Sequence, residues 1–181
     1  MDPMERMTRG DWYLDGPDLV GARDRCRRLL DRFNATADDD ARRPLMAGLF
    51  AHVGPGAVVL PRFRCSYGTQ ITLGAHCFVN TDALFMDDAA ITIGDHARLG
   101  PDVRLVTALH PVEDHDRRKA GWERAAPVTI GANAWLGVGV IVCPGVTVGA
   151  DTVVGAGSVV IRDLPDRVFA AGNPARVIRA L

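Results

Sequence analysis

Branched aliphatic side chains recur at every sixth position through the C-terminal part of the chain. The series is Ile130, Leu136, Val142, Val148, Val154 and Val160. Glycine directly follows four of these six residues. A period of six matches neither the 3.6-residue repeat of a helix nor the two-residue alternation of a half-buried strand. It indicates an internal repeat in which each hexapeptide supplies one short strand and one tight turn.

The same register is present upstream at Leu73, Val79 and Phe85, and it resumes after a two-residue slip at Ile93, Leu99 and Leu105. One short strand cannot bury an aliphatic side chain alone, so we expect three strands per coil, with coils stacked at the strand spacing of about 4.8 Å. The aliphatic residues, and the mostly small residues four positions after them, would face inward. Glycine would relieve backbone crowding at the turns. The pattern predicts a mainly β chain folded as a parallel β-helix and leaves the hand of the coil open.

Residues 1 to 53 have a helical texture instead. Apolar residues follow helical spacing in two runs, first at Leu19, Ala22, Cys26, Leu29, Leu30 and Phe33, and then at Leu45, Met46, Leu49, Phe50 and Val53. Pro17 and Asp18 suit the first turn of the first run. We expect two antiparallel helices with a turn over residues 34–40. The predicted organisation is a helical segment at 1–53 and a β-helix at 54–181 that includes a loop at 106–129 and a C-terminal tail at 165–181.

Composition and charge narrow the possible partners. The 181 residues carry 21 Lys and Arg against 22 Asp and Glu, and this balance leaves no electrostatic footprint for nucleic acid. The four cysteines, Cys26, Cys65, Cys77 and Cys143, form no CxxC pair. The N-terminal residues lack the apolar run of a signal peptide, and no other stretch could span a membrane. We expect a cytoplasmic protein with free thiols and with no nucleic-acid or membrane partner.

The repeat has one long interruption, between Leu105 and Ile130. This step of 25 residues is not a multiple of six, and the segment is rich in charged side chains. A long loop inside a compact repeat usually carries function. His110 lies at the start of the loop, directly before Pro111. A single histidine is most often structural, but its place in this break makes His110 a candidate general base.

Seven short segments share their order and spacing with one known group of enzymes. They are Gly-Asp-Trp-Tyr-Leu-Asp (10–15), Cys-Ser-Tyr-Gly (65–68), Phe-Val-Asn (78–80), Asp-Asp (87–88), His-Pro-Val (110–112), Trp-Leu-Gly (135–137) and Gly-Asn-Pro-Ala-Arg-Val-Ile (172–178). Any one is a weak signal, but together they resemble the maltose and galactoside acetyltransferase branch of the hexapeptide-repeat acyltransferases, which includes nodulation-type acetyltransferases. The resemblance covers nearly the whole chain. It implies a left-handed β-helix, O-acetyltransferase activity and a homotrimer.

In this family the histidine of the His-Pro-Val segment removes the proton from a sugar hydroxyl, and the oxygen attacks the thioester of acetyl-CoA directly in a ternary complex. The resemblance therefore implies that His110 is the general base, that Asn80 is its catalytic partner, and that no metal is required. The implied acceptor-binding residues are Asp15, Ser66, Asn80 and Asp88. The implied CoA-binding residues are Gly137, Val138, Ala156, Ile161, Arg162, Arg176 and Arg179. Each site would combine His110 of one chain with residues of its neighbour.

Two positions depart from the family pattern. Phe78 stands where close members carry tyrosine, and Trp122 stands where a smaller apolar residue is expected. An acetyltransferase that acts on an antibiotic or another small alcohol is therefore an alternative to a sugar enzyme. A γ-class carbonic anhydrase-like zinc hydratase is a second alternative, because His76, His110 and His115 could supply three zinc ligands. A non-catalytic scaffold that uses the β-helix only to trimerise is a third.

Overall fold

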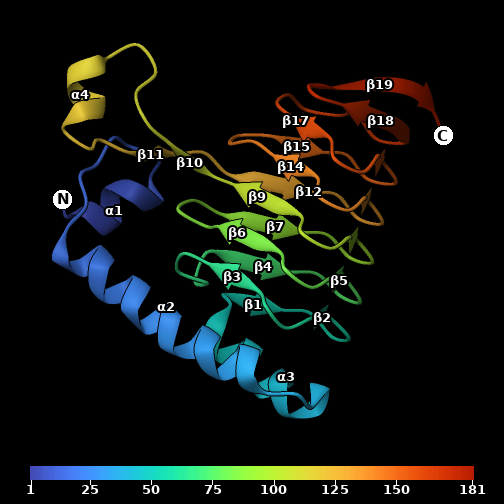
Figure 1. Ribbon diagram of the computed structural model, residues 1–181, viewed down its shortest axis with the longest axis horizontal. Helices are drawn as coiled ribbons and strands as arrows, with labels where there is room; N and C mark the ends of the chain where they lie inside the picture. The colour runs from blue at the N-terminus through green and yellow to red at the C-terminus, as the bar shows by residue number, and fades with distance from the viewer.

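The computed structural model of the protein describes residues 1–181, and a three-sided parallel β-helix makes up most of it (Figure 1). Helices α2 (Pro17–Ala35) and α3 (Asp39–Leu49) lie across the end of the coil where the first strands begin. The chain ends at the opposite end of the coil (Figure 1). None of the helices is both long enough and apolar enough to cross a membrane.

Each coil contributes one strand to each of three sheets. The first sheet contains β1 (His52–Val53), β4 (Ile71–Leu73), β7 (Ile91–Ile93), β12 (Val128–Ile130) and β15 (Thr147–Val148). The second contains β2 (Val58–Val59), β5 (Phe78–Val79), β8 (Arg98–Leu99), β13 (Trp135–Leu136), β16 (Val153–Val154), β18 (Val168–Gly172) and the antiparallel β19 (Ala175–Ala180). The third contains β3 (Arg64–Cys65), β6 (Leu84–Met86), β9 (Arg104–Val106), β14 (Ile141–Val142) and β17 (Val159–Val160). The connections between the sheets form three corners. The first corner leads from the first sheet to the second, the second corner leads from the second sheet to the third, and the third corner leads from the third sheet back to the first.

The inward-facing column is the one that the six-residue period predicts. Ile130 is fully buried, and it pairs in register with Ile93 of the preceding coil and Val148 of the following coil. The residues four positions after the aliphatic series are buried as well, namely Ala134, Val140, Val146, Thr152, Ser158 and Leu164. Burial of each branched aliphatic side chain stabilises the fold by roughly 1.5–3 kcal/mol. One continuous core of 33 residues joins the coil to both α2 and α3, so the helices are part of the same packing unit.

Glycine at the first corner allows successive coils to stack closely. A Cβ atom at Gly94 would lie 2.5 Å from the backbone nitrogen of Ala132 in the next coil, and a real carbon cannot approach so near. The equivalent residue in the other coils is also glycine, at Gly54, Gly74, Gly131 and Gly149. The expectation that glycine relieves crowding at the turns is therefore confirmed at this corner.

The N-terminal segment contains a third, short helix, α1 (Pro3–Thr8), which the apolar spacing did not predict. Pro17 occupies the first turn of α2, as expected. The prediction that the second helical run extends to Val53 is wrong, because α3 ends at Leu49 and residues 52–53 form β1. The backbone N–H of Ala51 already donates to the carbonyl oxygen of Ile71 in the next coil, so strand pairing overrides the helical spacing there.

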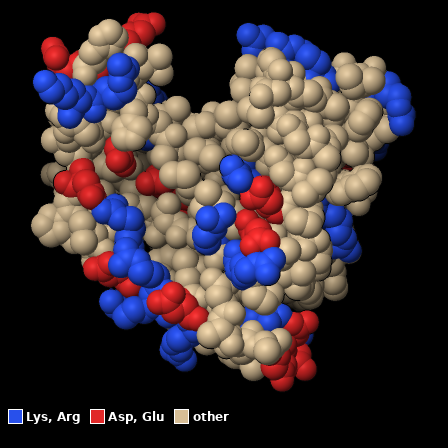
Figure 2. Space-filling model, viewed as in Figure 1, with Lys and Arg blue, Asp and Glu red and all other residues tan.

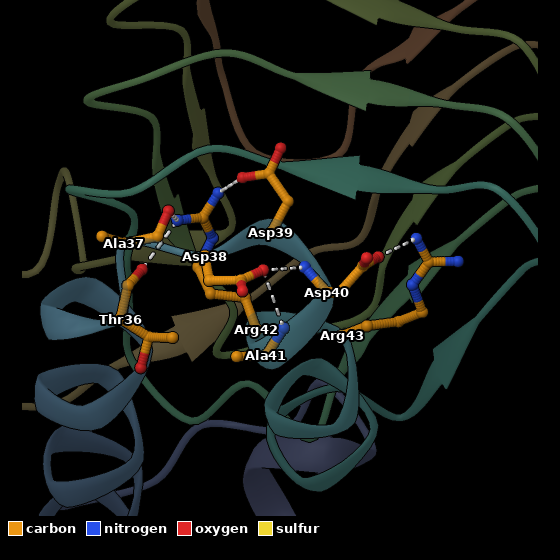
Figure 3. Close-up of polar contacts among 8 residues, drawn as sticks. All are labelled: Thr36, Ala37, Asp38, Asp39, Asp40, Ala41, Arg42 and Arg43. Carbon is orange, nitrogen blue, oxygen red and sulfur yellow. Dashed lines mark hydrogen bonds and ion pairs between the residues drawn. The ribbon is translucent and has the colours of Figure 1, made fainter.

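A buried arginine holds the turn between α2 and α3. The side chain of Arg42, in α3, donates to the carbonyl oxygens of Thr36 (2.7 Å) and Ala37 (3.0 Å) and pairs with the carboxylate of Asp39 (Figure 3). Asp38 caps α3, because its Oδ1 accepts the backbone N–H of Asp40. Carbonyl groups at a helix end have no helical partner, so these hydrogen bonds supply donors to two of them and tie the turn to α3.

Candidate active site

The third corner is where the chain departs from its six-residue period. The connection there spans residues 66–70 in one coil, 87–90 in the next and 107–127 in the third. The strands on both sides of these connections remain in register, so the additional residues project outward without disturbing the core. As a result, one corner of the coil carries three of the predicted site residues, Ser66, Asp88 and His110.

Residues 107–127 form an excursion that stands away from the coil near α1 (Figure 1). The excursion begins and ends with an antiparallel pair, β10 (Ala108–Leu109) and β11 (Arg124–Ala125), and carries the short helix α4 (His115–Lys119) between them. Figure 2 shows a hollow between the excursion and the C-terminal end of the coil. The loop predicted from the broken repeat is therefore an ordered arm at the edge of a hollow.

His110 directly follows β10, and its side chain is exposed. The ring Nδ1 lies 3.0 Å from the carbonyl oxygen of Trp122. A carbonyl oxygen only accepts hydrogen bonds, so this contact places the proton on Nδ1. Nε2 then carries a free lone pair, which is the form that a general base requires.

Asp88 lies nearby in a cluster of oxygen atoms. Its carboxylate is 7% exposed and lies 3.4 Å from the hydroxyl of Tyr13 and 3.5 Å from that of Ser66. The Tyr13 hydroxyl also lies 3.0 Å from a carboxylate oxygen of Glu123. Burial, and then the negative charge of Glu123, raise the pKa of Asp88 above its usual value. Asp88 is therefore a buried residue of this corner, and its carboxylate faces the hydroxyl groups of Tyr13 and Ser66.

Asp87 is fully buried and holds the shape of the corner. Its Oδ1 accepts the backbone N–H groups of Ser66 (2.9 Å) and Tyr67 (2.8 Å) from the preceding coil. Burial raises the pKa of Asp87 to about 7, while its hydrogen bonds from the backbone of Tyr67 and Gln70 limit that rise. Asp87 therefore orients Ser66, while Asp88 faces the cluster.

Asp15 reaches the same region from the segment before α2. It accepts a hydrogen bond from Arg23 (2.6 Å), and Arg23 also donates to the hydroxyl of Tyr67 (2.8 Å). Asp15, Tyr13 and Trp122 line a cavity of about 280 Å³ together with Arg6 and other residues of the N-terminal segment. The structure thus brings Asp15, Ser66 and Asp88, the residues predicted to bind the acceptor, to the region of the corner that carries His110.

Sequence reasoning missed Tyr13 and Glu123 as site residues. Their backbones exchange two hydrogen bonds of 2.9 Å, so the N-terminal segment pairs with the end of the excursion. The Tyr13 side chain is 1% exposed, and burial with the charges of Asp88 and Glu123 raises its pKa far above the usual value. The hydroxyl therefore stays protonated. Tyr13 belongs to a segment that carried the resemblance, but Glu123 had no signal in the sequence.

The remaining predicted residues lie elsewhere on the coil. Asn80 follows β5 at the second corner, where its N–H donates to the carbonyl oxygen of Leu99. Gly137, Val138 and Ala156 lie at the same corner of later coils, and Gly137 would place a Cβ 2.7 Å from the backbone nitrogen of Ala156. One chain therefore does not bring Asn80 to the corner of His110.

The other predicted CoA-binding residues lie near the C-terminal end of the coil. Ile161 and Arg162 follow β17, while Arg176 and Arg179 are part of β19. Arg162 and Arg176 line one cavity of about 150 Å³. Arg179 instead lies over the ring of Phe169, 6.0 Å from its centroid. Arg162 and Arg176 thus lie together, whereas Arg179 lies apart from them.

The family models matched by this chain are the maltose acetyltransferase hexapeptide capping motif, over residues 6–54, and the bacterial transferase hexapeptide, over residues 127–162. The chain is 39% identical to the galactoside O-acetyltransferase of Escherichia coli K12 over 100% of its own length and 90% of that protein's. The crystal structure of a maltose O-acetyltransferase from Clostridium difficile 630 superposes with a TM-score of 0.97 at 41% identity, and covers 100% of this chain and 98% of that one. A hexapeptide-repeat acetyltransferase from Vibrio cholerae, complexed with acetyl coenzyme A, gives a TM-score of 0.93 at 37% identity, with 100% and 99% coverage.

The chain belongs to the maltose and galactoside O-acetyltransferase family. The fold is accordingly the left-handed β-helix of this family, and the enzyme is an acetyltransferase. The resemblance drawn from the seven segments is confirmed, and the scaffold alternative is not supported.

The carbonic anhydrase alternative is not supported either. His76 lies at the first corner, where its ring stacks on that of His96 with centroids 5.2 Å apart. His110 and His115 belong to the excursion at the third corner. The structure contains no group of three His, Cys, Asp or Glu side chains that could hold a metal ion. His110 and His115 have a zinc-like spacing in sequence, but His76 lies at a different corner of the coil.

Proposed function

We propose that this enzyme transfers an acetyl group from acetyl-CoA to a hydroxyl of a sugar, with His110 as the general base. The observation that carries the proposal is the orientation of the His110 ring, with Nδ1 bound to the carbonyl oxygen of Trp122 and Nε2 free. A neutral imidazole suits proton removal near neutral pH. The carboxylates of Asp15 and Asp88 and the hydroxyl of Ser66 support a polyhydroxylated acceptor, because each carboxylate can accept hydrogen bonds from two hydroxyls.

The reaction then needs no covalent intermediate on the enzyme. Nε2 of His110 takes the proton of the acceptor hydroxyl while the oxygen forms a bond to the thioester carbonyl carbon. The C–S bond breaks, the product ester leaves, and the CoA sulfur receives a proton from the imidazolium. A backbone N–H near Val138 would stabilise the negative charge on the carbonyl oxygen. Holding both substrates in one ternary complex supplies much of the rate by proximity.

The donor site would run along the second corner. The stacked glycine and alanine backbones of Gly137 and Ala156 leave the coil edge narrow, and Val138 there is 51% exposed. These features suit an extended pantetheine chain. The backbone of Ile161 and Arg162 would continue this contact, and Arg176, with Arg179 further away, would meet the phosphates. Basic side chains gather at this end of the molecule (Figure 2).

The enzyme would act as a homotrimer in which each site combines two chains. Asn80 and the proposed donor site lie at the second corner, whereas His110 lies at the third, so a complete site requires a neighbouring copy. The outward face of the second sheet offers an apolar surface for such a neighbour, since Trp135 is 57% exposed. Four free cysteines fit a reducing compartment, and we place the enzyme in the cytoplasm on that ground.

The chemistry is tested by mixing the protein with acetyl-CoA and a panel of sugars and other alcohols and following the release of free thiol. We expect sugar-dependent release that His110→Ala abolishes. If none of the sugars gives release, the sugar proposal fails. Release with an antibiotic or another small alcohol instead would favour the alternative acceptor. Wild-type turnover in His110→Ala would remove His110 from the role of base.

The shared site has its own test. Chains carrying His110→Ala and chains carrying Asn80→Ala are co-expressed with different affinity tags, and oligomers that contain both are isolated. A mixed cyclic trimer contains two chains of one variant and one chain of the other. In both cases only one of its three sites has both residues intact, so we expect about one-third of wild-type activity. Inactive mixed oligomers would show that His110 and Asn80 do not act across an interface.

A further inference from the structure

Arg117 occupies an unusual position in the excursion. Its guanidinium carbon lies 4.5 Å from the ring centroid of Trp122 and 5.5 Å from that of Trp12. The three side chains come from different segments, because Arg117 is in α4, Trp122 follows that helix, and Trp12 belongs to the segment before α2. No residue of α4 is buried, so α4 has no apolar anchor of its own. The contact of one cation with two indole rings joins the excursion to the N-terminal segment.

The same arginine also holds the backbone of Trp122. The N–H of Trp122 donates to the carbonyl oxygen of Arg117 at 3.0 Å, and the carbonyl oxygen of Trp122 accepts from Nδ1 of His110 at 3.0 Å. Trp122 is therefore fixed by Arg117 through both its ring and its peptide. The exposed His110 ring has this single hydrogen bond to set its tautomer.

We infer that Arg117 is a positioning residue for His110. It acts through Trp122, whose carbonyl oxygen keeps the proton on Nδ1 and directs Nε2 toward the acceptor site. Trp12 completes the arrangement as the second indole beside the guanidinium. The inference deepens the proposed function and rests on His110 as the base. It also gives a role to Trp122, whose size departs from the family pattern.

The strength of the arrangement follows from its geometry. A cation over an exposed aromatic ring contributes about 0.5–1 kcal/mol, and more where water is excluded. Without the Arg117 side chain, the Trp122 ring loses this contact and only the backbone hydrogen bond to residue 117 still holds Trp122. The carbonyl oxygen then moves, and both tautomers of His110 become populated. A displacement of about 1 Å in a catalytic group can lower the rate by up to about 100-fold. The thioester-binding residues at the second corner are untouched.

The test compares Arg117→Ala, Arg117→Lys and the control Lys119→Ala, which removes a positive charge from an exposed residue of the same helix. We expect Arg117→Ala to lower kcat by about 10-fold or more while KM for acetyl-CoA stays unchanged. Arg117→Lys keeps a cation over the indoles, so its kcat should lie between those of the wild type and Arg117→Ala. Lys119→Ala should match wild type. Trp12→Leu, which leaves α4 intact, serves as an independent variant and should also lower kcat.

The decisive readout is the tautomer of His110, which the ¹⁵N spectrum of histidine-labelled protein reports above the imidazole pKa, with His110→Ala identifying its signals. We expect the Nδ1–H form in wild type and a mixture in Arg117→Ala. Unchanged kcat in Arg117→Ala overturns the inference, and so does a lower kcat with an unchanged His110 spectrum. If His110→Ala retains turnover, the proposed base is wrong, while the spectrum still reports separately whether Arg117 orients the ring.

Discussion

Replacing Glu123 by glutamine removes one of the two charges that share the Tyr13 hydroxyl and keeps the size of the side chain. The carboxylate oxygens of Glu123 and Asp88 lie 3.0 and 3.4 Å from that hydroxyl, so they are separated by at most about 6.4 Å, the sum of these distances. At an effective dielectric constant of about 20, two such charges repel by roughly 2–3 kcal/mol, against less than about 1 kcal/mol in bulk water. The amide oxygen accepts a weaker hydrogen bond from Tyr13 than the carboxylate, so the net gain in stability should be about 1 kcal/mol.

The gain depends on pH, because the repulsion requires both groups to be ionised. Burial and the Glu123 charge raise the pKa of Asp88 above its ordinary value of 3.8. When folding raises the pKa of a carboxyl group, the stability that this group contributes is fully present below its pKa in the unfolded state. That stability is lost as the pH rises through its pKa in the folded state. Glu123→Gln should therefore match wild type at about pH 3.5 and exceed its unfolding free energy at pH 8.

Urea unfolding followed by tryptophan fluorescence across this pH range measures the difference, with Glu113→Gln as the control. Glu113 is an exposed residue of the same excursion, and its replacement removes the same charge without touching the cluster. A stability difference that is equal at both ends of the pH range, or a control that behaves like Glu123→Gln, would refute the reasoning.

Two further predictions concern the fold. Gly94→Ala should destabilise the protein by about 1–3 kcal/mol or more, because the new Cβ meets the backbone of Ala132 in the next coil. Gly21 lies in α2, and a Cβ there would have nothing within 4 Å, so Gly21→Ala should stabilise the protein by about 0.5–1 kcal/mol. Equal melting temperatures in the two variants would contradict the stacking argument. Arg42→Met should cost about 1–3 kcal/mol by removing the charged donor of two hydrogen bonds at the α2–α3 turn. Urea unfolding measures this loss, which should be absent in Arg43→Met, a replacement of the exposed neighbour.

The coil could be predicted from the sequence because its physics is local and repetitive. Each aliphatic position faces the same environment in every coil, so one rule explains residues as far apart as Leu73 and Val160. The hand of the coil could not be predicted in this way, because the same side chains face inward in a left-handed and in a right-handed coil. Only the likeness to solved structures of the family decides it. The end of the second helix was missed for a related reason, since Phe50 and Val53 are apolar in either conformation and only pairing with the next coil makes residues 52–53 a strand.

The site was partly predictable because it lies where the period fails. The extra residues at the third corner include Asp88 and His110, and both failures of spacing are visible in the sequence. Tyr13, Arg117 and Glu123 lie in segments with no period, so no rule of spacing connects them. Their contacts depend on the excursion folding back over the N-terminal segment, which involves residues more than 100 positions apart in the chain.

The N-terminal helical segment is therefore more than a cap on the end of the coil. Tyr13 connects it to Asp88 and to the backbone of the excursion, and Trp12 connects it to the residue that holds the carbonyl oxygen bound to His110. The coil alone can place Asp88, because that residue is held between strands of the sheets. It cannot place His110, because the excursion has few buried side chains of its own. The repeat thus positions the proposed acceptor-binding residues Ser66 and Asp88, whereas the position of the proposed base depends on contacts between two non-repetitive segments.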